Sequence, residues 1–245
     1  MSHPPRLADY QAHYRKDAEL IEDPWALPPV RAASEDRRLE AMVRLLQLQP
    51  GQRLLDMGCG SGWLAARCRA RGAWVVATDI APRGVAAVRR RFPPVSRLVA
   101  ADVYHMPLRD GQFDAAVLSE VLEHLEAVEA AVAEAARLLR PGGRLLVTVP
   151  YRETIVQHLC IHCNRLTPAN AHLHSFDEEA LSGLLARCGL RPRQWLRLGN
   201  KLLELAGLPQ RARWLPYPAW RLADALLNRL TGRPAFVAVL AARDR

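Results

Sequence analysis

The apolar residues along this chain follow two alternating patterns. Compact apolar runs, such as the one that ends in Arg53-Leu54-Leu55, predict buried strands. Segments with an apolar residue at every third or fourth position, such as 63–70 and 122–139, predict helices. Since the two patterns alternate up to residue 150, we expect parallel strands joined by crossover helices. The sequence therefore predicts an α/β fold with a doubly wound, mostly parallel sheet.

Further elements are predicted on either side of this alternation. A helix is expected from an N-cap at Ser34 through Leu48. In the tail, strands are predicted at residues 191–198 and 236–241. Between them, helices are predicted at residues 202–208 and 218–230. We expect the second of these helices to pack on the core through an apolar face, with Asp224 and Asn228 on its opposite face.

Three glycines, Gly58, Gly60 and Gly62, lie between the first predicted strand and the helix that follows it. Glycines at such a place allow a sharp turn and a close approach of a ligand to the backbone. A dinucleotide site needs G-x-G-x-x-G, but here the third position is Trp63, and the carboxylate of Asp56 precedes the turn. Because a carboxylate repels a pyrophosphate and attracts a cation, the loop favours a positively charged nucleotide over NAD. An ordinary strand-to-helix turn is the alternative.

The segment Asp56-Met-Gly-Cys-Gly-Ser-Gly and four later ones resemble the motifs of the class I S-adenosylmethionine-dependent methyltransferases. The chain is similar in particular to the ubiquinone and menaquinone type of that family. The later segments are residues 75–79, 100–103, 113–124 and 138–147. The resemblance covers about residues 35–186 and implies a seven-stranded, Rossmann-like sheet with S-adenosyl-L-methionine as the cofactor.

The resemblance also implies roles for individual residues. The glycine loop would receive the methionine part of the cofactor, Asp79 would bind the ribose hydroxyls, and Asp102 would hydrogen-bond the adenine amino group. Asp79 and Asp102 could instead cap the helices that follow them. The expected cofactor-binding residues are Asp56, Gly58, Cys59, Gly60, Gly62, Asp79, Ile80, Asp102, Val103 and Ser119.

The same resemblance implies a domain organisation. Residues 1–33 would form a helical lid, or else a loosely packed extension. Residues 34–245 would form the methyltransferase domain. Two insertions are expected in it, a Cys/His-rich one at 152–176 and a basic helical one at 199–232.

His124 is the main candidate for catalysis because it follows the fourth predicted strand, at the edge where open α/β sheets bind ligands. A neutral imidazole there could remove a proton from a substrate hydroxyl as the methyl group arrives. The alternative is a histidine that only orders the start of a helix. Glu120 and Tyr151 are further catalytic candidates by the same positional argument.

The segment 152–176 contains a dense group of metal-binding residue types. Cys160 and Cys163 have the spacing of a zinc-binding pair, and His172 and His174 could complete a tetrahedral site. The histidine pair is closer than in the usual finger. The alternatives are a cap whose cysteines are merely buried, and a histidine that faces the substrate.

Charge is concentrated at one end of the chain. The net charge is +9, and residues 187–245 hold 12 basic and three acidic side chains, so the whole excess lies there. Tryptophans and a tyrosine lie among these arginines, which is typical of an amphipathic element at a membrane surface or an acyl substrate. Packing on the core is the alternative. No apolar run reaches the roughly 18 residues of a membrane span, and five cysteines without an export signal predict a cytoplasmic protein with reduced thiols.

These observations predict methyl transfer to an oxygen of a small or lipid-like acceptor, with peripheral membrane contact as a further hypothesis. No DNA partner is expected, since the Asn/Asp-Pro-Pro-Tyr motif of nucleic-acid amino-methyltransferases is replaced by residues 119–122, Ser-Glu-Val-Leu. Two rivals stay open: an RNA or protein methyltransferase that docks through the basic tail, and a non-catalytic cofactor-binding protein.

Overall fold

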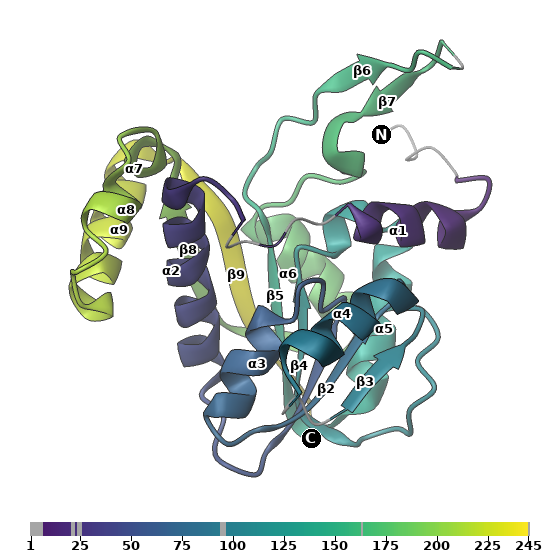
Figure 1. Ribbon diagram of the computed structural model, residues 1–245. Coiled ribbons are helices and arrows are strands. Elements are labelled where there is room, and N and C mark those ends of the chain that lie inside the picture. The colour runs from purple at the N-terminus through teal and green to yellow at the C-terminus, as the bar shows by residue number, and fades with distance from the viewer. Residues whose placement is uncertain (1–6, 21–22, 24–25, 94–96, 163, 245) are drawn as a thin grey trace.

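A seven-stranded sheet forms the centre of the computed structural model, which describes residues 7–20, 23, 26–93, 97–162 and 164–244 (Figure 1). Its strand order is β3-β2-β1-β4-β5-β9-β8. The strands are β1 (Arg53–Met57), β2 (Trp74–Asp79), β3 (Arg97–Ala100), β4 (Phe113–Ser119), β5 (Leu139–Pro150), β8 (Leu190–Asn200) and β9 (Pro234–Arg243). The first five pair in parallel, and β9 runs antiparallel to both β5 and β8. The predicted doubly wound, mostly parallel α/β fold is therefore confirmed.

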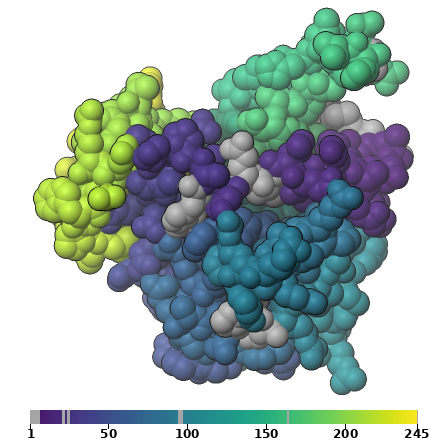
Figure 2. Space-filling model, in the orientation of Figure 1, coloured from purple at the N-terminus to yellow at the C-terminus, as the bar shows by residue number. Residues whose placement is uncertain are grey.

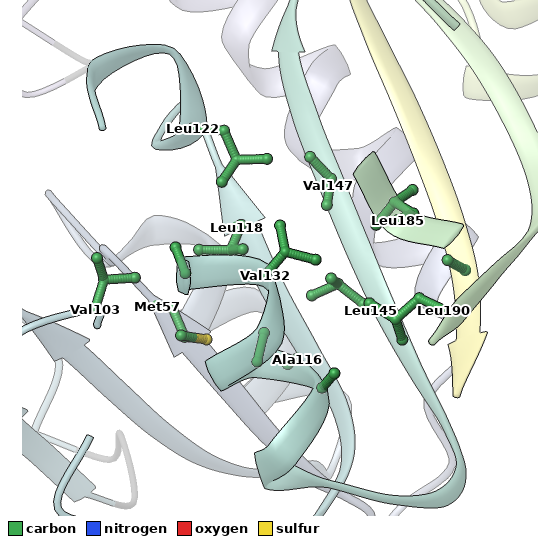
Figure 3. Packing of buried hydrophobic residues seen from close by; sticks show 14 of the residues in the cluster. Met57, Val103, Ala116, Leu118, Leu122, Val132, Leu145, Val147, Leu185 and Leu190 are labelled. Carbon is green, nitrogen blue, oxygen red and sulfur yellow. The ribbon is translucent and has the colours of Figure 1, made fainter. Parts of the chain in front are cut away.

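The two faces of the sheet carry two separate hydrophobic cores, because neighbouring residues of a strand point to opposite faces. Leu54 contributes to one core and Leu55, the next residue of β1, to the other. The core that contains Leu55 packs against α5 and α6, as Figure 3 shows for Val132 and Leu185. The core that contains Leu54 packs against helices on the other face. The helices beside the sheet are α2 (Pro29–Leu46), α3 (Trp63–Ala70), α4 (Pro82–Arg91), α5 (Val128–Leu138) and α6 (Glu178–Arg187).

Three element boundaries differ from the prediction. Helix α2 begins at Pro29, so Ser34 lies inside it and does not cap it; proline is well suited to the first turn because that turn has no use for its missing N–H. The predicted helix 122–139 is divided into η1 (Leu122–His124) and α5, because the Glu123 carbonyl accepts hydrogen bonds from the N–H groups of residues 173 and 174 in the distant insertion. The Pro-Gly-Gly segment after Leu139 belongs to β5, where it forms an irregularity in the pairing with β4.

Two parts of the chain project from the body of the molecule, one at the top and one on the left in Figures 1 and 2. One is a hairpin of β6 (Gln157–Leu159) and β7 (Leu166–Pro168), followed by η2 (Ala169–Ala171). The other, which we name the C-terminal lobe, covers residues 199–232 and contains α7 (Lys201–Leu205), α8 (Leu208–Arg211) and α9 (Tyr217–Thr231). Helix α1 (Tyr10–Glu19) lies near the hairpin. Among the residues described, no helix is both long enough and apolar enough to cross a membrane.

Helix α9 turns its polar face inward, contrary to the prediction, although Trp220 of the predicted apolar face is buried as well. Asp224 and Asn228 are buried, whereas Leu226 and Leu230 are exposed. Asn200, at the end of β8, explains the reversal because its side-chain amide donates to Asn228 Oδ1 at 2.8 Å and to a threonine hydroxyl of α9 at 2.9 Å. These buried hydrogen bonds direct the polar face of α9 inward.

Candidate functional site

A cavity of about 280 Å³ lies at the carboxyl ends of β1, β2 and β4. We name it the glycine-loop cavity, because Gly58 of the loop after β1 forms part of its wall. Helix α1 covers it through Tyr14, Asp17 and Ala18. The position agrees with the general rule that open α/β sheets bind ligands beyond the carboxyl ends of their strands.

The glycine loop requires its glycines for steric reasons. Gly58, Gly60 and Gly62 all have positive φ, at 76°, 47° and 79°, a region that residues with a Cβ atom rarely adopt. A Cβ on Gly58 would lie 2.6 Å from a methyl group of Val121, and one on Gly62 would lie 2.5 Å from a methyl group of Val88. The loop therefore brings bare backbone to the edge of the cavity.

Asp79, the last residue of β2, holds this loop in place. Its Oδ2 accepts a hydrogen bond from the Gly60 N–H at 3.0 Å, and its Oδ1 accepts one from the Ala81 N–H at 3.0 Å. The side chain is almost fully buried, and burial raises the pKa of its carboxyl group. Since Asp79 also lies on the wall of the cavity, it connects the backbone of the loop with the space that a ligand would occupy.

The residues at the start of the loop suit a cationic ligand. Asp56 is buried, and burial together with the charge of Asp79 raises the pKa of its carboxyl group to about 7. Among the described residues, Asp56 Oδ2 has no hydrogen-bond partner. Cys59, between Gly58 and Gly60, has a buried thiol whose pKa is also raised by burial. A buried carboxylate with a free oxygen is stabilised by a nearby positive charge, which a sulfonium cofactor would supply.

The far end of the cavity is formed by the segments after β2 and β3, through Ile80 and Val103. Asp102 lies beside them and is held by the covering helix: its Oδ2 accepts from the Tyr10 hydroxyl at 2.8 Å and from Gln11 Nε2 at 3.2 Å. Its Oδ1 accepts from the backbone N–H of residue 104 at 2.9 Å. Asp102 therefore fixes α1 over the cavity.

Glu120 has an unusual backbone conformation and lies at the boundary of two cavities. Its φ is 54°, a left-handed conformation that is costly for a residue with a long side chain. Glu120 lines the glycine-loop cavity and also a second cavity of about 450 Å³, which we name the outer cavity. Burial raises the pKa of its carboxyl group. The outer cavity is bounded by Glu35 and Phe236, by Lys201 and Glu204 of the C-terminal lobe, and by Glu153 and His172.

Arg38 of α2 organises the polar groups beneath Glu120, and the sequence analysis did not identify it. Its guanidinium donates to Ser119 Oγ at 3.1 Å, lies 3.3 Å from Glu120 Oε1, and forms a two-point ion pair with Glu35. Ser119 thus holds Arg38 and is not on the wall of the glycine-loop cavity. The signal in the sequence was the Glu35-x-x-Arg38 pair next to the apolar face of a helix.

His124 lies on the wall of the glycine-loop cavity, as the sequence analysis expected for a ligand-facing histidine. Its Nδ1 is 3.1 Å from a carboxylate oxygen of Asp17 in α1, without a hydrogen bond between them. The His172 ring meets the His124 ring edge to face, with 4.7 Å between the centroids. His172 Nδ1 in turn contacts the carboxylate of Glu153. Each histidine therefore has a carboxylate beside its Nδ1 nitrogen.

Glu123 completes this cluster from below. It is fully buried, and neither of its carboxylate oxygens has a hydrogen-bond partner in the described part of the chain. Burial and the charge of Glu120 raise its pKa well above the ordinary value. One ligand atom from each of Glu123, His124 and His172 can be chosen so that all three lie within 4.8 Å of one another. Two imidazoles and a carboxylate are a donor set that divalent transition metals accept.

The predicted zinc site is not supported. His174 Nε2 is hydrogen-bonded to the Leu125 carbonyl at 2.8 Å, and His172 belongs to the cluster with Glu123 and His124. Cys160 lies in the turn of the β6–β7 hairpin, where its backbone bonds to residues 164 and 165. Cys163 lies outside the described residues. The two histidines are used to fasten the insertion over η1, which their close spacing in the sequence did not indicate.

Tyr151, a predicted catalytic residue, is placed away from both cavities. Its ring is buried and lies beneath the guanidinium groups of Arg152 and Arg197, each about 5.3 Å from the ring centroid. The side chain hydrogen-bonds to Glu178, and burial raises the pKa of its hydroxyl. Tyr151 therefore packs at the edge of the sheet. Its place just after a strand did not put it in a cavity, because alternate residues there point to opposite faces.

Comparison with known proteins identifies relatives along the central part of the chain. Residues 55–147 match a family described as a methyltransferase domain. Residues 13–81 also match the family of protein-L-isoaspartate(D-aspartate) O-methyltransferases. A curated relative, demethylmenaquinone methyltransferase of Mycolicibacterium paratuberculosis, is 33% identical over 160 residues, which are 64% of this chain and 61% of the relative. The chain thus spans about three fifths of the length of that relative.

Solved structures share the fold across most of the chain. One is a 1,6-didemethyltoxoflavin-N1-methyltransferase from Burkholderia thailandensis with 1,6-didemethyltoxoflavin and S-adenosylhomocysteine bound; its TM-score is 0.62 at 19% identity, covering 98% of this chain and 92% of that one. Another is the cyclase SpnF, with a TM-score of 0.62 at 22% identity, covering 85% of this chain and 80% of that one. At such identities the likeness shows the fold, and the two names differ in reaction, so fold alone does not determine chemistry.

Proposed function

Because this chain belongs to the class I S-adenosylmethionine-dependent methyltransferases and is similar to quinone methyltransferases, we propose that it methylates an oxygen of a small or lipid-like acceptor. The observation that carries this proposal is the position of Glu120 on the walls of both cavities. A donor in the glycine-loop cavity and an acceptor in the outer cavity would meet at this point, beside His124 and His172.

The donor's place is the glycine-loop cavity. The cofactor's sulfonium supplies an activated methyl group. Gly58 would bring the backbone to the cofactor's amino-acid part, Asp79 would accept hydrogen bonds from the ribose hydroxyls, and Ile80 and Val103 would lie against the adenine. The protein's own contribution is to hold donor and acceptor in line and to exclude water, which can supply most of the rate acceleration of a bimolecular transfer. The cover formed by α1 provides that exclusion.

His124 is the base in this proposal. As the methyl group passes from sulfur to oxygen, its bond to sulfur would break and leave a neutral thioether, S-adenosylhomocysteine. The acceptor hydroxyl would lose its proton to the Nε2 nitrogen of the imidazole in the same step. The carboxylate of Asp17, 3.1 Å from Nδ1, stabilises the imidazolium that results. The acceptor leaves as its methyl ether, and the proton returns to solvent when α1 opens. His172 and Glu153, on the wall of the outer cavity, are placed to orient the acceptor's polar end.

The acceptor class rests on two supports. The name of the curated relative points to a quinone-like ring. Pro150, Ala235 and Phe236 give part of the outer cavity an apolar wall, which suits a ring or an attached apolar chain.

The test is methyl transfer from isotope-labelled cofactor to a panel of phenols and hydroquinones with short and long apolar tails, with product analysis that separates oxygen, nitrogen and carbon methylation. His124→Gln should lower kcat by roughly 10²–10⁴ and leave the affinity for S-adenosylhomocysteine unchanged. His158→Gln, on the exposed surface of the hairpin, is the matched control. Methylation of RNA or protein, but of none of these phenols, would refute the acceptor class, and bound cofactor without any turnover would favour a non-catalytic protein.

A second candidate is a metal-assisted version of the same transfer. The carboxylate of Glu123, which has no hydrogen-bond partner among the described residues, favours it, because such a buried group is costly unless a proton or a cation neutralises it. Glu123, His124 and His172 would hold a divalent cation, which would lower the pKa of an acceptor hydroxyl bound to it. Calorimetric titration of chelator-treated protein with Mn²⁺ tests this: Glu123→Gln should abolish binding, and the exposed Glu179→Gln should not. Equal heats for both variants would exclude the site.

A further inference from the structure

Helix α9 presents an uninterrupted apolar stripe to solvent. Leu222, Leu226 and Leu230 are 73%, 56% and 71% exposed. They are spaced by four residues, so they lie above one another on one side of the helix. Ala219 and Ala223 are exposed as well and fall on the same side. The outward face of α9 is therefore the one that an ordinary surface helix would turn toward the core.

The inward face of α9 cannot exchange places with this stripe. Its side chains include Asp224 and Asn228, which are buried and hydrogen-bonded to each other at 3.3 Å. Asn228 also accepts from Asn200 at 2.8 Å, and Asn200 in addition caps α7 by accepting from two backbone N–H groups. Rotation of α9 would break these buried bonds. The three leucines are therefore held outward by the polar network beneath them.

Exposed arginines precede α9, lie on it and follow it. Arg211, Arg213, Arg229 and Arg233 are exposed, and within the described part of the chain none of them forms an ion pair. The only acidic residues of the C-terminal lobe are Glu204, which is half-buried, and Asp224, which is buried. Trp214, just before α9, is 77% exposed. Figure 2 shows the lobe standing at one side of the molecule, with free access to its outer surface.

We propose that the C-terminal lobe docks on an anionic phospholipid membrane, with the leucine stripe at the acyl boundary and the arginines at the head groups. The charge pattern selects this occupant. A second copy of the chain would bring arginines against arginines, since a two-fold interface pairs each patch with itself. A nucleic acid would satisfy the arginines but leave the leucines in water. A bilayer with acidic head groups satisfies both, and an exposed indole is suited to the boundary between them.

Docking in this way would also serve the proposed function, on which this step rests. Lys201 and Glu204 of the lobe form part of the rim of the outer cavity. A lipid-like acceptor could therefore move from the bilayer into the outer cavity along the lobe itself, without passing through water. Acceptors with long apolar tails would then be methylated faster on vesicles than in detergent-free solution.

Vesicle flotation of the full chain tests the docking directly, without any need for turnover. Vesicles of phosphatidylcholine alone are compared with vesicles that also contain phosphatidylserine. The wild type should float with the second kind and be released by salt. Arg213→Gln with Arg229→Gln should weaken partitioning about thirtyfold, at roughly 1 kcal/mol per arginine. The matched control is Arg89→Gln with Arg109→Gln, two exposed arginines outside the lobe, which should leave partitioning within about twofold.

The stripe is tested by Leu222→Ser, Leu226→Ser and Leu230→Ser together. Since these side chains face solvent, the thermal stability should be retained, while partitioning should fall at least about tenfold for each leucine that the membrane buries. Affinity for S-adenosylhomocysteine should be unchanged, so a failure of docking stays separate from a failure of the proposed methyl transfer. Equal flotation of wild type and triple variant would overturn the proposal. So would a dimer in sedimentation experiments that the triple substitution converts to a monomer.

Discussion

Replacement of Asp79 by alanine should reveal two separate functions of this carboxylate. In the structure its two oxygens accept hydrogen bonds from the Gly60 and Ala81 N–H groups, both at 3.0 Å. In the proposed complex the same carboxylate also accepts from the ribose hydroxyls. Alanine removes all of these bonds, so the variant should be both less stable and weaker in cofactor binding.

The magnitudes follow from the kinds of bond that are lost. Hydrogen bonds to a charged group contribute roughly 1.5–3 kcal/mol, so the affinity for S-adenosylhomocysteine should fall about 10- to 150-fold. Without ligand, two backbone donors lose their acceptor, and the free energy of unfolding should fall by roughly 1–3 kcal/mol for each donor that water cannot reach. Asp79→Asn keeps one acceptor oxygen and should lose less in both respects.

Isothermal titration calorimetry measures the affinity, and urea unfolding of the ligand-free protein measures the stability. If Asp79→Ala binds S-adenosylhomocysteine within about twofold of the wild type, the assignment of the ribose to Asp79 is wrong. If binding falls and the unfolding curve is unchanged, the carboxylate contacts the cofactor but does not hold the glycine loop.

Three further changes test the framework around the site. Gly62→Ala forces a Cβ to 2.5 Å from a methyl group of α4 and should lower the free energy of unfolding by roughly 2–4 kcal/mol. Its control is Gly142→Ala, at a position with a similar φ but with nothing within 4 Å of the added Cβ. This control should lose only about 1 kcal/mol in the same urea experiment. Burial raises the pKa of Asp224 to about 6 from an ordinary 3.8, so its contribution to stability is full below pH 3.8 and is lost as the pH rises to about 6. Over that range Asp224→Asn should gain stability relative to the wild type, by at most about 3 kcal/mol. A gain that is equal at pH 4 and pH 7 would contradict this. Arg38→Lys keeps the charge but loses the two-point pairing with Glu35. The free energy of unfolding should fall by roughly 1–3 kcal/mol, which lowers the melting temperature by several degrees. Differential scanning calorimetry measures this, and an unchanged transition would contradict it.

The parts of the site that sequence reasoning found are those set by local chain geometry. Gly58 and Gly62 must be glycine because of their positive φ and their close neighbours, and such a requirement is visible in the sequence itself. Asp79 follows at the end of the next parallel strand, and parallel strands present their carboxyl ends at one edge. A short-range pattern and the alternation of elements were therefore enough to predict this half of the site.

The residues that were missed depend on contacts between distant segments. Arg38 meets Ser119, which is 81 residues away along the chain, and no periodicity in α2 announces that meeting. His172 was considered as a zinc ligand together with Cys160, Cys163 and His174, but the groups beside it in the structure, Glu123 and His124, come from another element. For α9, the hydrophobic pattern correctly separates two faces and does not say which one is inward. That choice is made by Asn200, a buried amide in β8.

The buried charge of Asp56 supports a last prediction, on proton release. Asp56 is buried, its Oδ2 has no hydrogen-bond partner among the residues that the structure describes, and its pKa is raised to about 7. A positively charged ligand nearby favours the carboxylate form and lowers that pKa. At pH 7 Asp56 is about half protonated in the free protein, so binding of S-adenosylmethionine should release up to about half a proton from it. S-adenosylhomocysteine has no sulfonium charge and should release less.

Calorimetry in buffers of different ionisation enthalpy counts these protons for each ligand. The two ligands differ only in the methyl group and its charge, so the difference between their proton counts isolates the electrostatic effect of the sulfonium. Asp56→Asn has no proton to release and should remove the difference while keeping the shape of the site. Equal counts for the two ligands in the wild type would mean that Asp56 does not respond to the sulfonium charge. The raised pKa of Asp56 would then reflect only burial and the charge of Asp79, and the carboxylate before the glycine loop would not explain a preference for a cationic cofactor.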